Sequence, residues 1–317
     1  EITTRLVGSE MCIRDRKYQE EQHKENSYIT ILGLHKKLPI QDAWIKLNIL
    51  TEEELKRKQT ETQWDFLNQY DEYSGRRSGK TYDAETLVIE PGNKVVLAGP
   101  GMGKSTLCKK LFLQAGAMNK FAIKVRLWDV AGYMREGVAF EIALCKAMCQ
   151  SLAVEFTKAE LAHFFSIIIL DGLDECGDYR RTVAKSIAVW GYGHPYQMII
   201  VTSRPIGYDL TELADYNHYQ ILPMDEWQME SSSQKLMELV QQDCEKQYQW
   251  FRKRLQNYEL HKLACRSPLV LGFMVQLSLQ KKDFGNSKIS LYQEIVNEWL
   301  PVSYTHLRAH ETRSNLV

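Results

Sequence analysis

The chain has 317 residues, of which 44% are hydrophobic and 25% charged, with 40 basic and 40 acidic side chains. This balance is typical of a globular protein, and a neutral total gives no electrostatic reason to expect nucleic acid or an anionic membrane as the main partner. No apolar run approaches the roughly 18 residues of a membrane span. The seven cysteines lack the spacing of a disulfide or metal framework. We therefore expect a cytoplasmic protein with reduced thiols.

The two ends of the chain look unrelated to the rest. Residues 6–15 can be written in codons whose reverse complement encodes residues 302–311, as in a sequencing-library adaptor translated from each strand. We therefore interpret residues 1–16 and 302–317 as adaptor-like, non-native tails and exclude them from fold reasoning. The remainder is expected to be a fragment of a longer protein.

Residues 17–81 are expected to form an N-terminal helical and linker region. Polar stretches rich in Glu, Gln and Lys predict helices over 18–26 and 52–70, and alternation of apolar and polar residues over 44–48 predicts a short edge strand. The basic segment 76–80 has the composition of a flexible connector.

Residues 82–225 are expected to form an α/β core. Helical periodicity predicts helices from about residue 104 to 113, over 138–152 and over 179–190. Strands that alternate with helices imply a parallel five-stranded sheet with helices on both faces, which is a three-layer sandwich. After residue 225 the pattern is helical, and residues 226–287 are expected to form a helical subdomain. The predicted strands are 94–98, 121–127, 166–170, 198–201 and 218–222.

A glycine-rich segment follows the first core strand. Residues 98–105 read AGPGMGKS and match the P-loop pattern, in which glycines let backbone N–H groups wrap phosphates. The helix that begins near Lys104 points its positive dipole end at the same place. Lys104 is expected to reach the β- and γ-phosphates, and Ser105 to ligate Mg²⁺. The expected nucleotide-binding residues are Gly99, Pro100, Gly101, Met102, Gly103, Lys104, Ser105 and Thr106.

A second segment, SIIILDGLDE at 166–175, ends a buried strand in carboxylates. An acid at the end of such a strand can hold the Mg²⁺ water shell opposite a P-loop, so Asp171 is the expected metal residue. Asp174 and Glu175 lie just beyond it, near an attacking water. Glu175 is the preferred general base, with Asp174 left open as the alternative.

A third segment, IIVTSRP at 199–205, ends a strand in two hydroxyls and a guanidinium. The carboxyl edge of the sheet is where ligands of such folds bind. Arg204 is therefore expected to sense the γ-phosphate or to stabilise charge in the transition state.

Together these segments resemble the NACHT module of the STAND signal-transduction NTPases. The motifs LAGPGMGKST, LDGLDE and VTSRP occur in the order of that family, and the doubled acids after Asp171 are its most specific feature. Weaker resemblances lie at 43–47, 263–271 and 290–296. The resemblance implies that Pro268 abuts the adenine and that residues 288–301 begin a truncated winged-helix domain.

The same resemblance implies an ATP/ADP switch in signalling or defence. In that family an ADP-bound monomer exchanges to ATP, opens and forms homo-oligomers through this module, so that attached effector domains cluster. Effector and sensor domains of the full-length protein would then be its partners. The family's winged-helix histidine, which holds ADP, has no counterpart in this chain.

Other classes of nucleotide-binding protein fit less well. A GTPase needs an N/TKxD motif after the acidic strand, and the nearest match, residues 157–160, precedes that strand and ends in Glu. A metabolic kinase needs an arginine-rich lid, which the helical tail does not clearly show. An AAA+-like ATPase shares the sheet, and a nucleotide-locked scaffold without useful turnover would have the same sequence pattern. Both of these remain alternatives.

Overall fold

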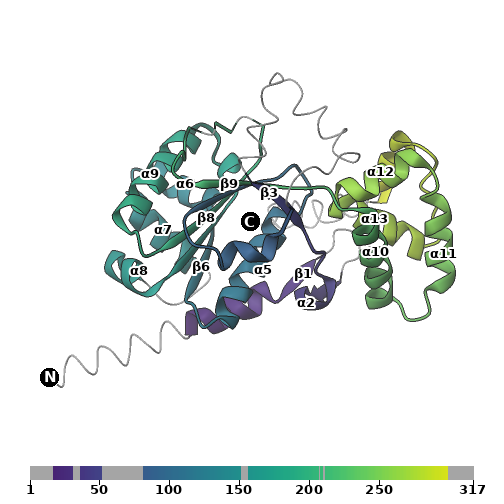
Figure 1. The fold of residues 1–317 in the computed structure, drawn as a ribbon, viewed down its shortest axis with the longest axis horizontal. Coiled ribbons are helices and arrows are strands. Elements are labelled where there is room, and N and C mark those ends of the chain that lie inside the picture. The colour runs from purple at the N-terminus through teal and green to yellow at the C-terminus, as the bar shows by residue number, and fades with distance from the viewer. Residues whose placement is uncertain are drawn as a thin grey trace, which may run out of the picture. The chain divides into compact units, whose positions relative to one another are not determined.

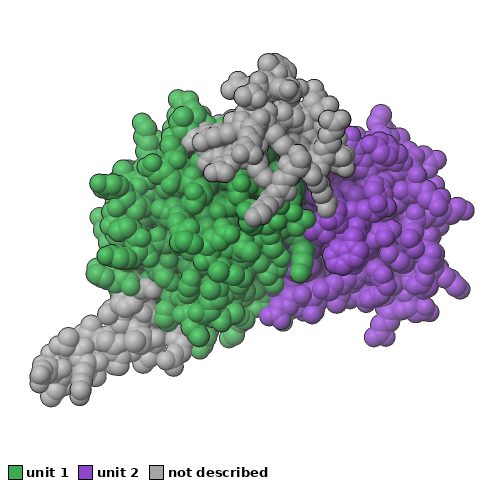
Figure 2. Space-filling model, in the orientation of Figure 1, with its two compact units in different colours: residues 1–28, 46–222 green, residues 29–45, 223–317 purple. Residues whose placement is uncertain are grey.

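A computed structural model of the chain describes residues 17–30, 36–51, 81–150, 156–206, 208–209 and 211–298 (Figure 1). The predicted helix 52–70, the connector 76–80 and the two adaptor-like tails lie outside these residues. The chain divides into two compact units (Figure 2). Unit 1 comprises residues 1–28 and 46–222, and unit 2 comprises residues 29–45 and 223–317.

A seven-stranded sheet forms the centre of unit 1, in the order β4-β3-β9-β5-β8-β7-β6. The five strands from β5 to β9 run parallel to one another, which confirms the predicted parallel α/β core. Strand β8 lies between β5 and β7, although it follows both of them in the sequence. The bounds are β5 (Lys94–Leu97), β6 (Ala122–Arg126), β7 (Ile167–Asp171), β8 (Met198–Ser203) and β9 (Asn217–Ile221).

Two antiparallel strands, β3 (Asn48–Thr51) and β4 (Tyr82–Asp83), extend the sheet beyond β9. The prediction of an edge strand over 44–48 was wrong in two respects. The strand begins at Asn48, and it is not at the edge of the sheet, because β4 pairs with the side that faces away from β9. Ile49 and Leu50 are consecutive and both buried, so this strand is covered on both faces. A strand of this kind has no alternation for the sequence pattern to detect.

Helices cover both faces of the parallel strands. Alternate residues such as Val95, Ile123 and Ile168 share one core with α6 (Leu127–Arg135), α7 (Phe140–Cys149), α8 (Lys158–Phe164) and α9 (Arg180–Gly193). On the opposite side, α5 (Lys104–Ala117) contacts β6 and β7, and η1 (Ala84–Val88) contacts α5 (Figure 1). This arrangement confirms the predicted three layers.

The sequence pattern missed α6 and α8, which are short and follow other elements closely. α7 begins at Phe140, two residues after the predicted start. Thr157 caps α8 through a reciprocal capping box with Glu160. Residues 157–160, which are the nearest match to the N/TKxD motif of GTPases, therefore form the start of a helix.

The predicted N-terminal helix is confirmed at residues 17–26. Tyr18 is buried in unit 1, where its ring makes edge-to-face contacts with Phe156 and Phe165. The Gln19 amide donates to the backbone oxygen of Ala122 at 2.6 Å. Side chains of this helix therefore belong to the core of unit 1.

Unit 2 is mainly helical, as predicted for the region after residue 225. Its core gathers Phe251, Leu271, Met274 and Phe284 with residues of α2 (Ile40–Ala43) and β2 (Lys37–Pro39), which pairs with β1 (Tyr28–Thr30). A further helix covers residues 288–298. Whether it begins a winged-helix domain stays a prediction. The principal helices are α10 (Glu226–Val240), α11 (Glu245–Arg254), α12 (Tyr258–Arg266) and α13 (Pro268–Leu279).

Candidate functional site

The glycine-rich segment connects β5 to α5 at the carboxyl end of the parallel sheet. Gly101 and Gly103 have φ of 72° and 87°, in the left-handed region that a residue with a Cβ rarely adopts. Gly103 is also the N-cap of α5 and its carbonyl accepts the bond from Leu107 N at 2.8 Å, which begins the helix. The turn thus needs glycine at these two positions, and it ends at a helix N-terminus suited to an anion.

Lys104 folds back over this turn. Its Nζ donates to the backbone oxygen of Ala98 at 3.3 Å. Burial lowers the pKa of the Lys104 ammonium, and the Arg204 guanidinium lowers it further, whereas carboxylates nearby raise it. The amine is therefore held at the mouth of the glycine turn, among charges that come from two other strands.

The other predicted P-loop residues occupy the same turn and the first turn of α5. Ser105 is exposed and Thr106 half-buried, so the Ser105 hydroxyl is accessible, as a metal ligand would need to be. Pro100 is exposed on the outside of the turn, and Met102 is buried beneath it.

Asp171 ends β7 and is buried. Thr202 Oγ1 donates to Asp171 Oδ1 at 2.7 Å and accepts from the backbone N–H of Gly172 at 3.0 Å. The register explains this contact, because Leu170 pairs with Val201 and the next residues along β7 and β8 are Asp171 and Thr202. The candidate metal residue is therefore held in a fixed orientation by its neighbouring strand.

The doubled acids lie in η2 (Leu173–Tyr179), a 3-10 turn that follows Gly172. Gly172 has a φ of 84°, and a Cβ built there would lie 3.1 Å from Glu175 Cδ. Glycine therefore makes the turn possible and leaves room for the Glu175 side chain. From α6, Arg135 Nη2 donates to the Cys176 carbonyl at 2.6 Å, so a neighbouring helix also supports the turn.

Arg204 follows β8 directly, and its backbone N–H and its side chain both contact Asp174. Its backbone N–H donates to Asp174 Oδ1 at 3.0 Å, and its Nε lies 2.9 Å from Asp174 Oδ2. The Asp174 side chain is 12% exposed and that of Arg204 is 49% exposed. The guanidinium is therefore the more exposed partner, and the carboxylate that holds it is half-buried.

The neighbouring strands β5, β7 and β8 thus bring the predicted residues together at one edge of the sheet. We call Lys104, Asp171, Asp174, Glu175 and Arg204 the strand-end cluster. The Ala98 N–H donates to the Ser203 carbonyl at 3.0 Å and the Arg204 N–H donates to Asp174 Oδ1 at 3.0 Å, so backbone bonds join the three strand ends. A glycine turn that offers N–H groups, a lysine and a buried acid can hold a phosphate chain together with a divalent cation.

Pro268, predicted to touch the adenine, lies in unit 2. It is the first residue of α13, where its missing N–H costs no helical bond, and the Ser267 hydroxyl caps the same helix. Its contact with a nucleotide stays a prediction.

Sequence reasoning did not assign a role to Thr202 or to Cys108. Cys108 lies on α5, fully buried, and burial raises the pKa of its thiol well above the usual range. The signal for Thr202 was its position directly after the predicted strand 198–201, which matches that of Asp171 after the predicted strand 166–170. Cys108 offered no such signal.

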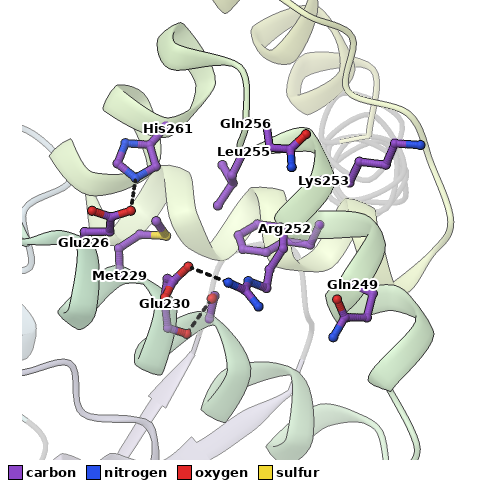
Figure 3. Close-up of a pocket in the computed structure, with 11 residues that line it drawn as sticks. Glu226, Met229, Glu230, Gln249, Arg252, Lys253, Leu255, Gln256 and His261 are labelled. Carbon is purple, nitrogen blue, oxygen red and sulfur yellow. Dashed lines mark hydrogen bonds and ion pairs between the residues drawn. The ribbon is translucent and has the colours of Figure 1, made fainter.

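A second cluster of charges lines a groove in unit 2, with a volume of about 460 Å³ (Figure 3). We call it the helical groove. Glu226 and Glu230 of α10 face His261 and Arg252, at 3.8 Å and 3.5 Å respectively. Met229 is among the buried apolar residues that line it.

Two further properties hold for the described part of the chain. None of its helices is both long and apolar enough to cross a bilayer. No three of its His, Cys, Asp and Glu side chains are arranged to hold a metal by themselves.

No protein-family model matches the sequence, and no curated protein matches it. Solved structures with a distant likeness include a DNA replication initiation factor, domain III of the Thermotoga maritima replication initiation protein DnaA, and a replication initiator DnaA bound to AMPPCP and single-stranded DNA. Their identities to this chain are 12%, 14% and 13%, and the TM-score is 0.35 in each case.

These matches cover 73%, 61% and 73% of this chain, and 61%, 87% and 91% of the other chains. The chain thus spans 61% of the first structure's length. At these scores the likeness supports no statement about what this chain binds or does.

Proposed function

We propose that this chain binds ATP and ADP with Mg²⁺ at the strand-end cluster and hydrolyses ATP. The observation that carries the proposal is the meeting of three features at one sheet edge. These are the glycine turn with Lys104, the buried Asp171 held by Thr202, and the half-exposed Arg204. A chance glycine-rich turn would not be expected to face a fixed carboxylate and a presented guanidinium.

Each residue has a role that its position supports. Backbone N–H groups of the turn and Lys104 would bind the phosphates, and Ser105 and Asp171 would hold Mg²⁺. Bound Mg²⁺ supplies positive charge that offsets the charge developing on the phosphates. Glu175 is exposed beside Gly172 and would take the proton from the attacking water.

The finer hypothesis is a NACHT-type switch in the cytoplasm. It rests on the motif resemblance, in which Pro268 abuts the adenine and the ATP-bound state forms homo-oligomers that cluster effector domains. An AAA+-like ATPase is the alternative with the same sheet, and a nucleotide-locked scaffold is the alternative without turnover. The rate of ATP turnover in Glu175→Gln, compared with the wild type, separates the nucleotide-locked scaffold from an ATPase.

The direct test is Lys104→Ala, with Mg²⁺-ATP and Mg²⁺-ADP affinity measured by calorimetry. Loss of the ammonium removes charge-assisted bonds to two phosphates, so affinity for both nucleotides should fall about a hundredfold or more. Lys185→Ala is the matched control, because Lys185 is an exposed lysine on α9. Wild-type affinity in Lys104→Ala would contradict the proposed site.

A further inference from the structure

Asp174 and Glu175 are neighbours in the same turn, yet their surroundings differ. Both oxygens of the Asp174 carboxylate are engaged by Arg204, one by its backbone N–H at 3.0 Å and the other by Nε at 2.9 Å. Glu175 is exposed, and its carboxyl group lies over Gly172. The two acids are therefore not equivalent candidates for one chemical role.

The contact through Nε leaves the end of the guanidinium available. Within the described residues, Arg204 bonds only through its backbone and Nε, and its side chain is 49% exposed. A guanidinium fixed at Nε presents its two Nη groups as a planar fork, which suits bidentate binding of a phosphate. The Arg204 backbone N–H bonds to the same carboxylate as Nε. Contacts at the backbone and at Nε therefore both restrict the direction in which the Nη groups point.

The fork belongs to the phosphate end of the site. The Ala98 backbone N–H, at the start of the glycine turn, donates to the Ser203 carbonyl at 3.0 Å, and the Ala98 carbonyl accepts from Lys104 Nζ at 3.3 Å. Arg204 directly follows Ser203, so Arg204 and its partner Asp174 lie beside the glycine turn that holds Lys104.

We propose that Asp174 is a positioning residue that braces Arg204 toward the terminal phosphate, and that this pair sets the preference of the site for ATP over ADP. The proposal rests on the proposed nucleotide function. It removes Asp174 from the candidates for the general base, because one oxygen of its carboxylate accepts a hydrogen bond from the Arg204 backbone and the other is ion-paired with the Arg204 side chain, so neither is presented to an attacking water. Glu175 then remains for that role.

The test compares affinities for ADP and for a non-hydrolysable ATP analogue, both with Mg²⁺, measured by calorimetry on the full chain. Arg204→Ala should lower the ratio of triphosphate to diphosphate affinity about tenfold, since a charge-assisted contact to the third phosphate is lost. Asp174→Ala should lower the same ratio by a similar factor, although it removes no group that touches the nucleotide.

Two further variants make the role specific. The double variant Asp174→Ala with Arg204→Ala should lower the ratio no further than Arg204→Ala alone, because both changes remove one interaction. Asp174→Asn should give an intermediate ratio, since its amide oxygen can still accept one of the two bonds. Asp178→Asn, an exposed acid in the same turn, is the charge-matched control and should leave the ratio unchanged.

Three outcomes would overturn the brace. A ratio that rises in Asp174→Asn would mean that the carboxylate competes with the phosphate for Arg204. A wild-type ratio in Asp174→Ala would mean that Arg204 needs no support, and equal losses for both nucleotides would mean a purely structural role. The expected fall in ratio, without a comparable loss of ADP affinity, supports it.

A nucleotide-free measurement keeps this proposal distinct from the proposed function. The Arg204 Nε–H resonance should be protected from exchange with water in the wild type and lose that protection in Asp174→Ala. Protection that persists in the variant would sink the brace even if nucleotide binds. If the resonance behaves as expected but nucleotide does not bind, the proposed function fails and the claim about ATP preference fails with it.

Discussion

The strand-end cluster and the helical groove both bring acids and bases together, and they are built differently. In the strand-end cluster the acids end strands or lie in the turn that follows, and two of them are held by hydrogen bonds to or from a neighbouring strand. In the helical groove, Glu226 and Glu230 extend from the surface of α10, and their contacts run between side chains (Figure 3).

This difference decides how firmly each charge is held. A carboxylate tied to a backbone N–H or to a buried hydroxyl can adopt few positions, whereas two long exposed side chains must lose conformational freedom to meet. The structure therefore favours chemistry at the strand ends and predicts little energetic value for the pairs in the groove.

The largest effect is expected for Glu175→Gln. The change keeps the size of the side chain but removes the proposed base, so single-turnover ATP hydrolysis should slow about 10²–10⁴-fold. ATP affinity should change far less. Equal, near-zero turnover in the wild type and the variant would contradict the ATPase and leave the nucleotide-locked scaffold. Asp174→Asn is the comparison, because Asp174 was the alternative base in the sequence pattern.

A smaller effect is expected for Thr202→Val, which removes a buried hydroxyl and keeps its volume. Asp171 Oδ1 and the Gly172 N–H would each lose a partner, so the free energy of unfolding should fall by about 1–3 kcal/mol. Denaturant unfolding measures this, and Thr202→Ser, which keeps the hydroxyl, should restore most of the loss. Full stability in the valine variant would mean that Asp171 is held in another way.

Lys94, at the start of β5, is another charged side chain that is held by backbone groups. It is fully buried, its Nζ donates to three backbone carbonyls, and burial lowers its pKa to about 8. In the unfolded chain a lysine retains a pKa near 10.4. Between these values the unfolded state binds more protons, so this residue's contribution to stability rises with pH.

The unfolding free energy of the wild type, relative to that of Lys94→Met, should therefore increase by about 2 kcal/mol between pH 7 and pH 9.5. Denaturant unfolding of both proteins at several pH values provides the measurement. The three carbonyls lose their partner in the variant at every pH, so that loss cancels in the comparison. Parallel pH profiles would show that the pKa of Lys94 is the same folded and unfolded.

The smallest effect is expected in the helical groove. Glu230 and Arg252 lie 3.5 Å apart with side chains 41% and 51% exposed, so a double-mutant cycle with Glu230→Gln and Arg252→Gln should give a coupling below about 1 kcal/mol. The coupling should weaken further in high salt. A coupling of several kcal/mol would contradict this prediction. It would show that the charges in the groove are held as firmly as those of the strand-end cluster.

Much of unit 1 could be predicted from the sequence. The β5, β7 and β8 strands and the turn at Gly101 and Gly103 depend on local signals, namely apolar runs and glycine spacing, and the structure has them where they were expected. The strand β3 could not be predicted correctly, because residues buried on both faces carry no alternation.

Within the site, local sequence is enough to predict which residue types lie at the ends of the core strands, because each follows its strand directly in the chain. It could not decide between Asp174 and Glu175, which are adjacent and chemically similar. The folded structure was needed to show that β8 lies between β5 and β7, that Thr202 contacts Asp171, and that Arg204 contacts Asp174. These contacts join residues about 30 positions apart, and they follow from sheet order and register, which depend on the packing of the whole unit rather than on local sequence.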